Sequence, residues 1–463
     1  MRGFRYARRG PDIGRGGRFG PAGLAFVVAI AAGCDDAMVD PLSNVSGTRI
    51  PPAHGCTNPN HSGSTVWTSG LHPRQIAAAY GIDKLWDAGF RGQGRRVALI
   101  EPGQRLDSAE FRSFSECFGP FNFEFPVEIV VRGGRPSFVG DEPNFDSQTL
   151  LTVAPELEKI YLFESGNNDM ENLPHLLAAA LDPARTDGEL VHAISISYGV
   201  CEAAVLRSQI ERSSVHFKRA AELGVKVFIA MGDQGSPGWF PGPGGVNCVD
   251  WPAELPPPPG VELGVIFPPS TPWAIAVGGT ELAIDGRIPF LGSREGGILT
   301  SEVVWNQHIP DEGEGRWVGA GGRSSIFSIS EAIWQNDLAG LTGMRQTPDV
   351  AAMAGSPFYP GESFGTSGAA PMVAGAMMVV DSYLLGHGIE PPGFLSPVLY
   401  RLALTDYERV FRDVVEGDND VYNLGCCYAK PGYDMASGLG AIRFDQLAEV
   451  LRERPAGPDA SIP

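Results

Sequence analysis

The sequence predicts an α/β protein built on a doubly wound, mainly parallel sheet flanked by helices. Short apolar segments alternate with helical segments along the first half of the chain, without an internal repeat. Strands that alternate with helices are joined by parallel crossover connections. At 463 residues, with 43% hydrophobic and 19% charged residues, the chain can bury a large core.

The expected elements follow from the pattern of apolar residues. Strands are predicted at residues 96–101, 127–131, 159–163, 193–197 and 225–230. Helices are predicted at residues 72–82, where Gly81 is the stop signal, and at 143–153, 172–181 and 203–223. In a parallel sheet of this kind, functional sites form at the carboxyl ends of the strands.

The N-terminal residues predict export. Six arginines precede an uncharged stretch at residues 19–33, which contains a short apolar core and ends in small residues. This pattern is typical of an export signal and too short for a spanning helix of the mature protein. Residues 31–34, Ala-Ala-Gly-Cys, resemble a bacterial lipobox, in which Cys34 would carry a lipid. Plain cleavage and secretion is the alternative, so we expect either a bacterial cell-envelope lipoprotein or a secreted protein.

The rest of the chain is expected to form one domain. Residues 34–68 are rich in Pro, Ser, Asn, Gly and Thr and predict a flexible tether; the domain spans 69–455, and 456–463 form a tail. The net charge of −19 argues against nucleic acid as a partner. In an exported chain, six cysteines permit up to three disulfide bonds: Cys56, Cys117, Cys201, Cys248, Cys426 and Cys427.

The segment around Ser367 carries the main functional signal. Glycines flank the Thr366-Ser367 pair, and an almost wholly apolar run follows, which predicts a buried helix. Pro371 is expected in the first turn of that helix. A hydroxyl at the N-terminus of a buried helix, beside glycines that admit close backbone approach, is suited to nucleophilic attack. The structural alternative is a buried serine at a tight helix start.

Carboxylates at predicted strand ends are the candidate partners of Ser367. Glu142 and Asp146 lie one helical turn apart, so both can project from the same face. Asp233 directly follows the strand predicted at 225–230, and a carboxyl group kept protonated there could donate a hydrogen bond to an oxyanion. The structural alternatives are a solvated acidic helix end for the pair and a turn aspartate for Asp233.

Several segments, in order along the chain, resemble the sedolisin family of serine-carboxyl peptidases, and together they cover about residues 71–448. They are Tyr80-Gly81-Ile82 with Gly92-x-Gly94, Glu142-x-x-x-Asp146, Ser195-Ile196-Ser197-Tyr198-Gly199, Gly232-Asp233-x-Gly235, Phe267 to Trp273 with Ala276 to Thr280, Pro348 to Ala352, Gly365-Thr366-Ser367, and Gly432-Tyr433-Asp434-x-x-x-Gly438. None of the eight histidines lies in the His-Gly-Thr-His setting usual in subtilisins. The resemblance implies a subtilisin-like fold without a catalytic histidine.

The resemblance also implies roles for the candidate residues. Ser367 would attack the scissile carbonyl, Glu142 would act as general base and then acid, Asp146 would orient Glu142, and Asp233 would stabilise the oxyanion. Glu101 matches an additional glutamate of the kumamolisin-like branch, with a strand-end acid as the alternative. The expected activity is endopeptidase cleavage of peptide or protein substrates at acidic pH, by a monomer. An inactive sedolisin-like binding module on the envelope, or a structural lipoprotein there, is the alternative.

A calcium site near the C-terminus is a further implication of the resemblance. The carboxylates of Asp413 and Asp434 would combine with the backbone carbonyls of Val414, Lys430 and Gly432, and all-oxygen ligation suits Ca²⁺. Sedolisins usually carry a large N-terminal prosegment, whereas only about 35 residues separate Cys34 from the predicted domain. The route of activation is therefore left open.

Overall fold

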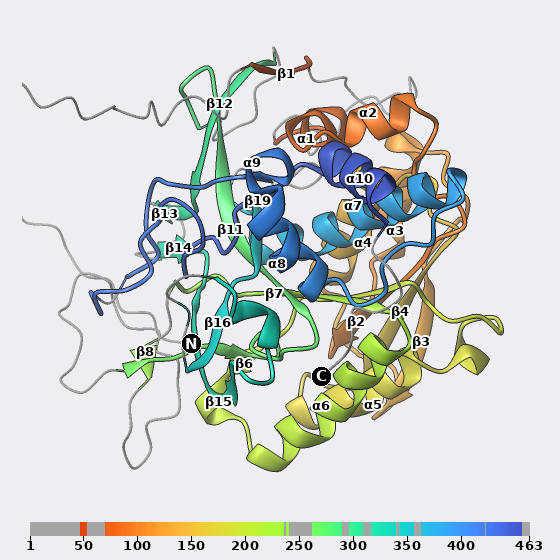
Figure 1. Ribbon diagram of the computed structural model, residues 1–463. Helices are drawn as coiled ribbons and strands as arrows, with labels where there is room; N and C mark the ends of the chain where they lie inside the picture. Colours follow the sequence, from red (N-terminus) through yellow and green to blue (C-terminus); the bar gives the residue numbers. More distant parts are fainter. Residues whose placement is uncertain are drawn as a thin grey trace, which may run out of the picture. The chain divides into compact units, whose positions relative to one another are not determined.

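A nine-stranded sheet organises the structure, which is a computed structural model. The structure describes residues 47–52, 70–235, 238–239, 262–288, 296–308, 316–338, 341, 343–355, 363–421 and 423–455. They all belong to one unit, residues 42–463. The strand order is β1-β12-β11-β7-β5-β2-β4-β3, and β17 pairs with β11 (Figure 1).

The centre of this sheet is parallel. The parallel strands are β2 (Arg96–Pro102), β3 (Val127–Arg132), β4 (Lys159–Ser165), β5 (Ala193–Ile196), β7 (Lys226–Ala230), β11 (Ile275–Ile284) and β17 (Val350–Met353). At one edge, β12 (Gly297–Val304) and β1 (Thr48–Ile50) are antiparallel to their neighbours. The predicted mainly parallel sheet is therefore confirmed, and the five predicted strands correspond to β2, β3, β4, β5 and β7.

Helices cover both faces of the sheet. The helices α4 (Glu142–Val153) and α7 (Thr366–Gly386) pack on one face, and α5 (Leu173–Ala180) and α6 (Arg207–Glu222) on the other (Figure 1). Side chains of β2 alternate between the two resulting cores: Val97 and Leu99 join the core of α4 and α7, whereas Ala98 and Ile100 join that of α5 and α6. This is the two-residue period of a strand buried on both faces.

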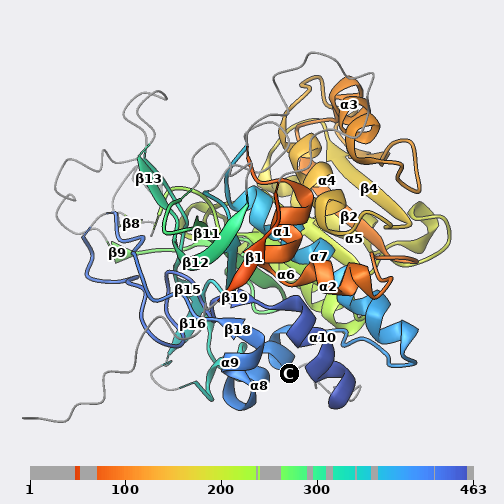
Figure 2. The same ribbon diagram turned by 90° about the horizontal axis from the view of Figure 1, so that it is seen from above.

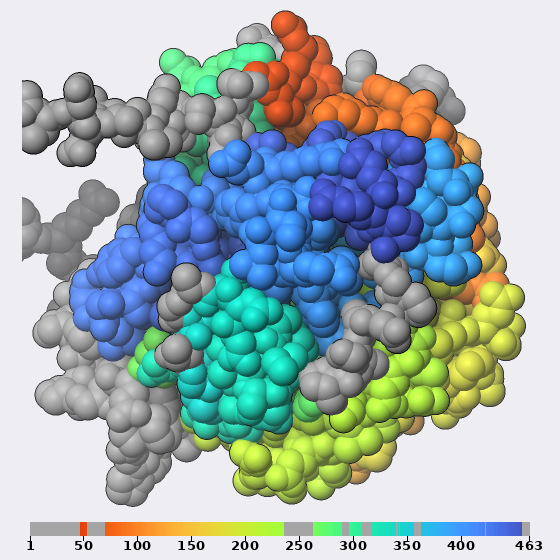
Figure 3. All heavy atoms as spheres, viewed as in Figure 1, coloured from red at the N-terminus to blue at the C-terminus, as the bar shows by residue number. Residues whose placement is uncertain are grey.

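The remaining helices lie outside these layers. They are α1 (Pro73–Ala79), α2 (Ile82–Asp87), α3 (Ser108–Phe118), α8 (Ser396–Thr405), α9 (Tyr407–Val410) and α10 (Phe444–Glu453). The helix α1 lies beside β1 (Figure 2), and the C-terminal α10 packs against α2 and α7. In the space-filling view the dark blue C-terminal segment lies on the surface (Figure 3). The N-terminal helix α2 and the C-terminal helix α10 therefore contact each other, and both contact α7.

The central helix α7 is buried along its length. Among the described residues it is the one helix long and apolar enough to span a membrane, but 94% of its most apolar stretch is covered by the protein. It is therefore the core helix that the sequence predicts. The expectation for Pro371 was wrong, because this residue lies inside the helix, beyond the first turn. Gly365 is the N-cap residue, so the helix starts close to Ser367 and Pro371 falls one turn later.

The N-terminal part of the domain corrects one further expectation and confirms another. Residues 48–50 lie in the predicted tether but form β1, which pairs with residues 297–299 and buries Ile50. A strand of three residues is too short to show an alternating pattern, and its partner strand supplies its support. The helix predicted at 72–82 with Gly81 as its stop is confirmed as α1, which ends before Gly81 with its left-handed φ of 74°, and a second helix, α2, then begins at Ile82.

Some predictions fall outside the described residues. These are the export signal at 1–33, Cys34 and its lipid, the rest of the tether, Cys56, Cys248 and the tail at 456–463. Of the other cysteines, Cys117 and Cys201 are each disulfide-bonded, and Cys426 and Cys427 are bonded to each other.

Candidate active site

Ser367 and Glu142 meet where the packed helices α7 and α4 begin. Ser367 lies in the first turn of α7, partly exposed, and its hydroxyl is close enough to the Glu142 carboxyl to lower the pKa of that group. The two helices approach closely because Gly375 has no side chain: a Cβ there would lie 2.7 Å from Cγ2 of Val153. A packed helix pair thus fixes the spacing between the hydroxyl and the carboxyl group.

Two more carboxyl groups lie behind Glu142. Asp146, one turn further along α4, is fully buried, and Glu101, at the carboxyl end of β2, is 2% exposed. Burial and then the negative charge of Glu142 raise the pKa of Asp146, and a hydrogen bond from Ser197 opposes that shift. Burial, followed by the charges of Asp146 and Glu142, raises the pKa of Glu101 well above its usual value.

The first carboxyl group of this cluster is also shifted. Burial raises the pKa of Glu142 to about 7, against the effect of the Ser367 hydroxyl. Within the described part of the chain, no basic side chain is among the groups that shift the pKa of Glu142, Asp146 or Glu101. Without a nearby cation, three close carboxyl groups repel one another when all are ionised. This cluster must therefore retain protons at pH values where an exposed carboxyl group is ionised.

Asp233 approaches Ser367 from another direction. It follows β7, and its Oδ1 accepts hydrogen bonds from the Thr366 N–H (2.8 Å) and hydroxyl (2.7 Å). A Cβ on Gly365 would lie 2.9 Å from Oδ2, so glycine is needed there. Burial raises the pKa of Asp233. Because both donors contact Oδ1, Oδ2 is the oxygen left to carry a proton.

Sequence reasoning assigned no role to Thr366, Ser197 or Glu164. Thr366 anchors Asp233, and the Ser197 hydroxyl contacts Asp146. Glu164 of β4 is paired in register with Glu101 of β2 and adds to the negative charge around it. The useful signal was position, since Ser197 is the last residue of one predicted apolar strand and Glu164 lies just beyond another.

The predicted calcium ligands are also neighbours. Asp413 accepts a hydrogen bond from the Gly432 N–H and Asp434 one from the Lys430 N–H, both at 2.9 Å. Within the described residues, no hydrogen bond reaches the carbonyl oxygens of Val414, Lys430 or Gly432. Gly432 has a φ of 79°, whereas Lys430 is not among the residues with positive φ, so its side chain is tolerated.

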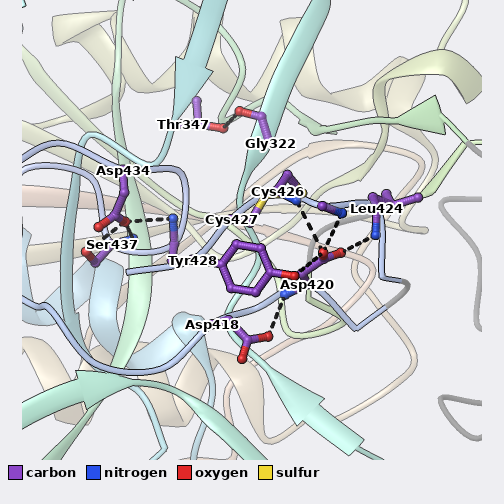
Figure 4. The surroundings of a disulfide bond; sticks show 12 residues. Gly322, Thr347, Asp418, Asp420, Leu424, Cys426, Cys427, Tyr428, Asp434 and Ser437 are labelled. Atoms are coloured by element: carbon purple, nitrogen blue, oxygen red, sulfur yellow. Dashed lines mark hydrogen bonds between the residues drawn. A yellow bond between two sulfur atoms is a disulfide. The ribbon is translucent and has the colours of Figure 1, made fainter. Parts of the chain in front are cut away.

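This donor set has the chemistry that a hard cation prefers, since it consists of carboxylate and carbonyl oxygens alone, and the three carbonyl oxygens accept no hydrogen bond from the described residues. A larger acidic cluster is lacking, because no group of three or more His, Cys, Asp or Glu residues suited to a metal occurs in the described ranges. Figure 4 shows Asp434 bonded to Ser437, and Asp420 accepting hydrogen bonds from Leu424, Cys426 and Tyr428. Asp420 thus organises the loop that carries the Cys426–Cys427 disulfide.

Two known peptidases are similar to this chain over most of its length. Kumamolisin of Bacillus sp. (strain MN-32) is 30% identical over 403 residues, which are 82% of this chain and 63% of kumamolisin. This similarity supports the resemblance to the sedolisin family and its kumamolisin-like branch. Tripeptidyl-peptidase 1 of Canis lupus familiaris, another similar protein, is 24% identical over 432 residues, covering 87% of this chain and 69% of that protein. No protein-family model matches the chain.

A solved structure shares the fold of this chain. The structure of Pseudomonas sedolisin, a serine-carboxyl proteinase complexed with pseudo-iodotyrostatin, has a TM-score of 0.64 and 21% identity. The similarity covers 84% of this chain and 99% of the sedolisin chain. The predicted resemblance, including that to the kumamolisin-like branch, and the subtilisin-like fold are therefore confirmed. This chain spans 63% of the length of kumamolisin.

Proposed function

We propose that this chain is a serine-carboxyl endopeptidase that hydrolyses peptide bonds at acidic pH. One observation carries the proposal: the carboxyl groups of Glu142 and Asp233 both lie close to the first turn of α7, which carries Ser367. A hydroxyl with a basic and an acidic group nearby is what acyl transfer requires. An inactive binding module would need none of these contacts.

Glu142 would move the proton in each step. As Oγ of Ser367 attacks the scissile carbonyl carbon, the carboxylate of Glu142 takes the hydroxyl proton and then gives it to the leaving amine. Water attacks the resulting acyl-enzyme ester by the same route, and Ser367 recovers its proton as the acid product leaves. Asp146, one turn behind on α4, holds Glu142 in place and shares its charge.

Asp233 would stabilise the tetrahedral intermediate. Its protonated Oδ2 would donate a hydrogen bond to the oxyanion, while Thr366 holds Oδ1. The intermediate would also lie at the N-terminus of α7, where the backbone favours negative charge. Glu101, buried behind Asp146, would act as an auxiliary that limits how much charge the cluster bears.

The active state needs Glu142 ionised and Asp233 protonated, so the pair must hold one proton. That state is most populated midway between the two pKa values of the pair. The pKa of Glu142 is about 7, and that of Asp233 rises from a lower starting value of 3.8. The optimum is therefore expected on the acidic side of neutrality.

The test is digestion of a peptide library by the chain across the acidic range up to neutrality. We expect internal cleavage with an acidic optimum, and a loss of about 10³-fold or more in Ser367→Ala, whose circular dichroism should match that of the original protein. Equal cleavage by Ser367→Ala, or an optimum at or above neutrality, would contradict the mechanism. Release of short N-terminal fragments alone would correct the endopeptidase assignment.

We also propose that calcium binds Asp413 and Asp434 together with the carbonyl groups of Val414, Lys430 and Gly432. The ion would supply a structural cross-link, closing the loop between β18 (Phe411–Arg412) and β19 (Ala441–Ile442). The support is the donor set, whose carboxylates are held in place by backbone N–H groups of the same loop.

Export is a further proposal, which rests on residues 1–34 of the sequence. We propose a monomer either anchored to the bacterial envelope through a lipid on Cys34 or secreted without it. Mass spectrometry of the N-terminus of the exported protein distinguishes the two, because a lipid adds mass to Cys34. Retention of residues 1–33 in the exported protein would contradict both.

A further inference from the structure

The side chain of Ser197 joins two parts of the candidate active site that lie far apart in the sequence. It directly follows β5, and its Oγ lies 2.7 Å from Oδ2 of Asp146 and 3.3 Å from the carbonyl oxygen of Ser367. One contact reaches α4 and the other the first turn of α7. The proposed roles of Glu142 and Ser367 do not involve this hydroxyl.

The contact with α7 has a specific cause. In an α-helix the carbonyl of residue 367 would accept a hydrogen bond from the N–H of residue 371, four positions later. That residue is Pro371, which has no N–H to donate. The Ser197 hydroxyl reaches the carbonyl that Pro371 cannot serve. Ser197 therefore contacts the helix at the residue that carries the nucleophile.

The contact with α4 divides the two oxygens of Asp146. Oδ2 accepts the hydrogen bond from Ser197, whereas Oδ1 is buried and has no hydrogen-bond partner among the described residues. A proton on Asp146 is then best placed on Oδ1, because Oδ2 already has a donor. The same holds for Oε1 of Glu142, which is buried without a described partner. These orphan oxygens belong to neighbouring carboxyl groups that can share a proton.

We propose that Ser197 is a positioning residue for the peptidase reaction. By donating to Oδ2 of Asp146, it keeps Oδ1 as the oxygen that carries the proton. By contacting the Ser367 carbonyl, it also holds the first turn of α7 in place relative to Asp146 and Glu142. The Ser197 hydroxyl has one proton, and the shorter contact, to Asp146, takes the larger share of it. This inference rests on the proposed function.

The charges around Asp146 decide the direction of the expected effect. Glu142 of its own helix and Glu101 of β2 face it, Glu164 of β4 lies beyond Glu101, and Asp233 acts on Glu142. All four are acidic, so the Ser197 hydrogen bond is a specific interaction that favours the charged form of Asp146. Removing this donor should make Asp146 hold its proton to higher pH.

The chain offers a matched control in β5, the strand that leads to Ser197. Ser195, two residues earlier, is fully buried, and its hydroxyl has no hydrogen-bond partner in the described structure. The variants are therefore Ser197→Ala, Ser195→Ala and Ser197→Thr, which keeps the hydroxyl. Each is measured for kcat and KM on one peptide substrate across pH, and for its melting temperature.

We expect Ser197→Ala to lower kcat about 10- to 100-fold with KM changed by no more than about twofold. The acidic limb of the pH profile should move to lower pH, because a protonated Asp146 no longer repels the charge on Glu142. Ser195→Ala should keep both values and the limb, and Ser197→Thr should recover most of the activity. A loss of kcat in Ser197→Ala without movement of the limb would indicate a structural role alone and overturn the proposal. Equal losses in both alanine variants would do the same.

A second measurement does not depend on cleavage. The infrared band of protonated buried carboxyl groups is followed against pH, and the contribution of Asp146 is identified as the part absent in Asp146→Asn. That contribution should persist to higher pH in Ser197→Ala than in the original protein. If peptides are not cleaved but the band shifts, the proposed function fails while the contact between Ser197 and Asp146 stands; an unshifted band overturns the inference itself.

Discussion

Two sets of buried carboxyl groups in this protein differ in whether a cation lies beside them. Asp349 receives two hydrogen bonds from Arg345, at 2.9 and 2.7 Å, one from the Tyr400 hydroxyl and one from the Ala276 N–H. Glu302 is paired in the same way with Arg412. In this first set the negative charge is compensated and the carboxyl oxygens are satisfied.

The carboxyl groups near Ser367 form the opposite set. Oε1 of Glu101, Oε1 of Glu142 and Oδ1 of Asp146 are buried, and none has a hydrogen-bond partner among the described residues. Their pKa values are raised by burial and by each other. The comparison teaches that this protein stabilises buried charge where it builds the fold, and leaves it uncompensated where protons must move.

The largest expected effect is on catalysis by the uncompensated set. Glu142→Gln should lower kcat about 10³-fold, because an amide cannot accept the Ser367 proton. The melting temperature at neutral pH should stay equal or rise, since the variant no longer buries a charge. Peptide hydrolysis and thermal unfolding check this, and a strong loss of stability would show that Glu142 belongs with the structural set.

The compensated set should respond in the reverse way. Arg345→Met should lower the free energy of unfolding by about 3–5 kcal/mol, because Asp349 is left buried without its cation. The folded enzyme should keep its kcat at low temperature. Arg112→Met is the control, since Arg112 and Glu124 are exposed and such pairs contribute less than about 1 kcal/mol. Similar stability in the two variants, by denaturant titration, would remove the distinction between the sets.

The pH dependence of stability separates the sets further. The pKa of Glu142 is raised from 4.5 to about 7. Its contribution to the free energy of unfolding is therefore complete below pH 4.5, the unfolded pKa, and is lost as the pH rises through 7. This loss is on the order of 3 kcal/mol. The fall in unfolding free energy between mildly acidic and neutral pH should therefore be shallower in Glu142→Gln than in the original protein, and identical slopes would contradict the raised pKa.

The smallest expected effect concerns calcium. A bound cation would compensate the charge of a further pair of carboxyl groups, Asp413 and Asp434. Removing calcium with a chelator should lower the unfolding free energy by about 2–3 kcal/mol, the value expected when the ion is present at about 100 times its dissociation constant. Asp413→Asn should lower the melting temperature and abolish its response to the chelator. If the original protein melts at the same temperature with and without calcium, the proposed site is not a calcium site.

Local patterns in the first half of the chain were sufficient to predict β2, β3, β4, β5 and β7. Four of them, β2, β4, β5 and β7, are short, mostly apolar runs, as expected for strands buried on both faces. The edge strand β3 is partly exposed, but its apolar residues were still enough to predict it. The strands β1 and β12 were not predicted: β1 is short, and in β12 buried and partly exposed residues are mixed. Their pairing depends on each other and on β11, which no local pattern contains.

For the site, family motifs located Ser367, Glu142, Asp146 and Asp233, and the structure brings all four together. The same motifs contain Thr366 and Ser197 but do not show what they contact. A hydroxyl serves many structural purposes, so only its neighbours reveal its purpose.

The sequence by itself determined the parallel sheet, the buried helix that carries Ser367, and the one-turn spacing of Glu142 and Asp146, because these depend on the short-range periods of strand and helix. Tertiary structure alone decided which oxygen of Asp146 and of Asp233 is held by a donor and which is left to carry a proton. Those donors, Ser197 and Thr366, lie 51 and 133 residues away along the chain, and only the packing of α4 and α7 on the sheet brings them within hydrogen-bond distance.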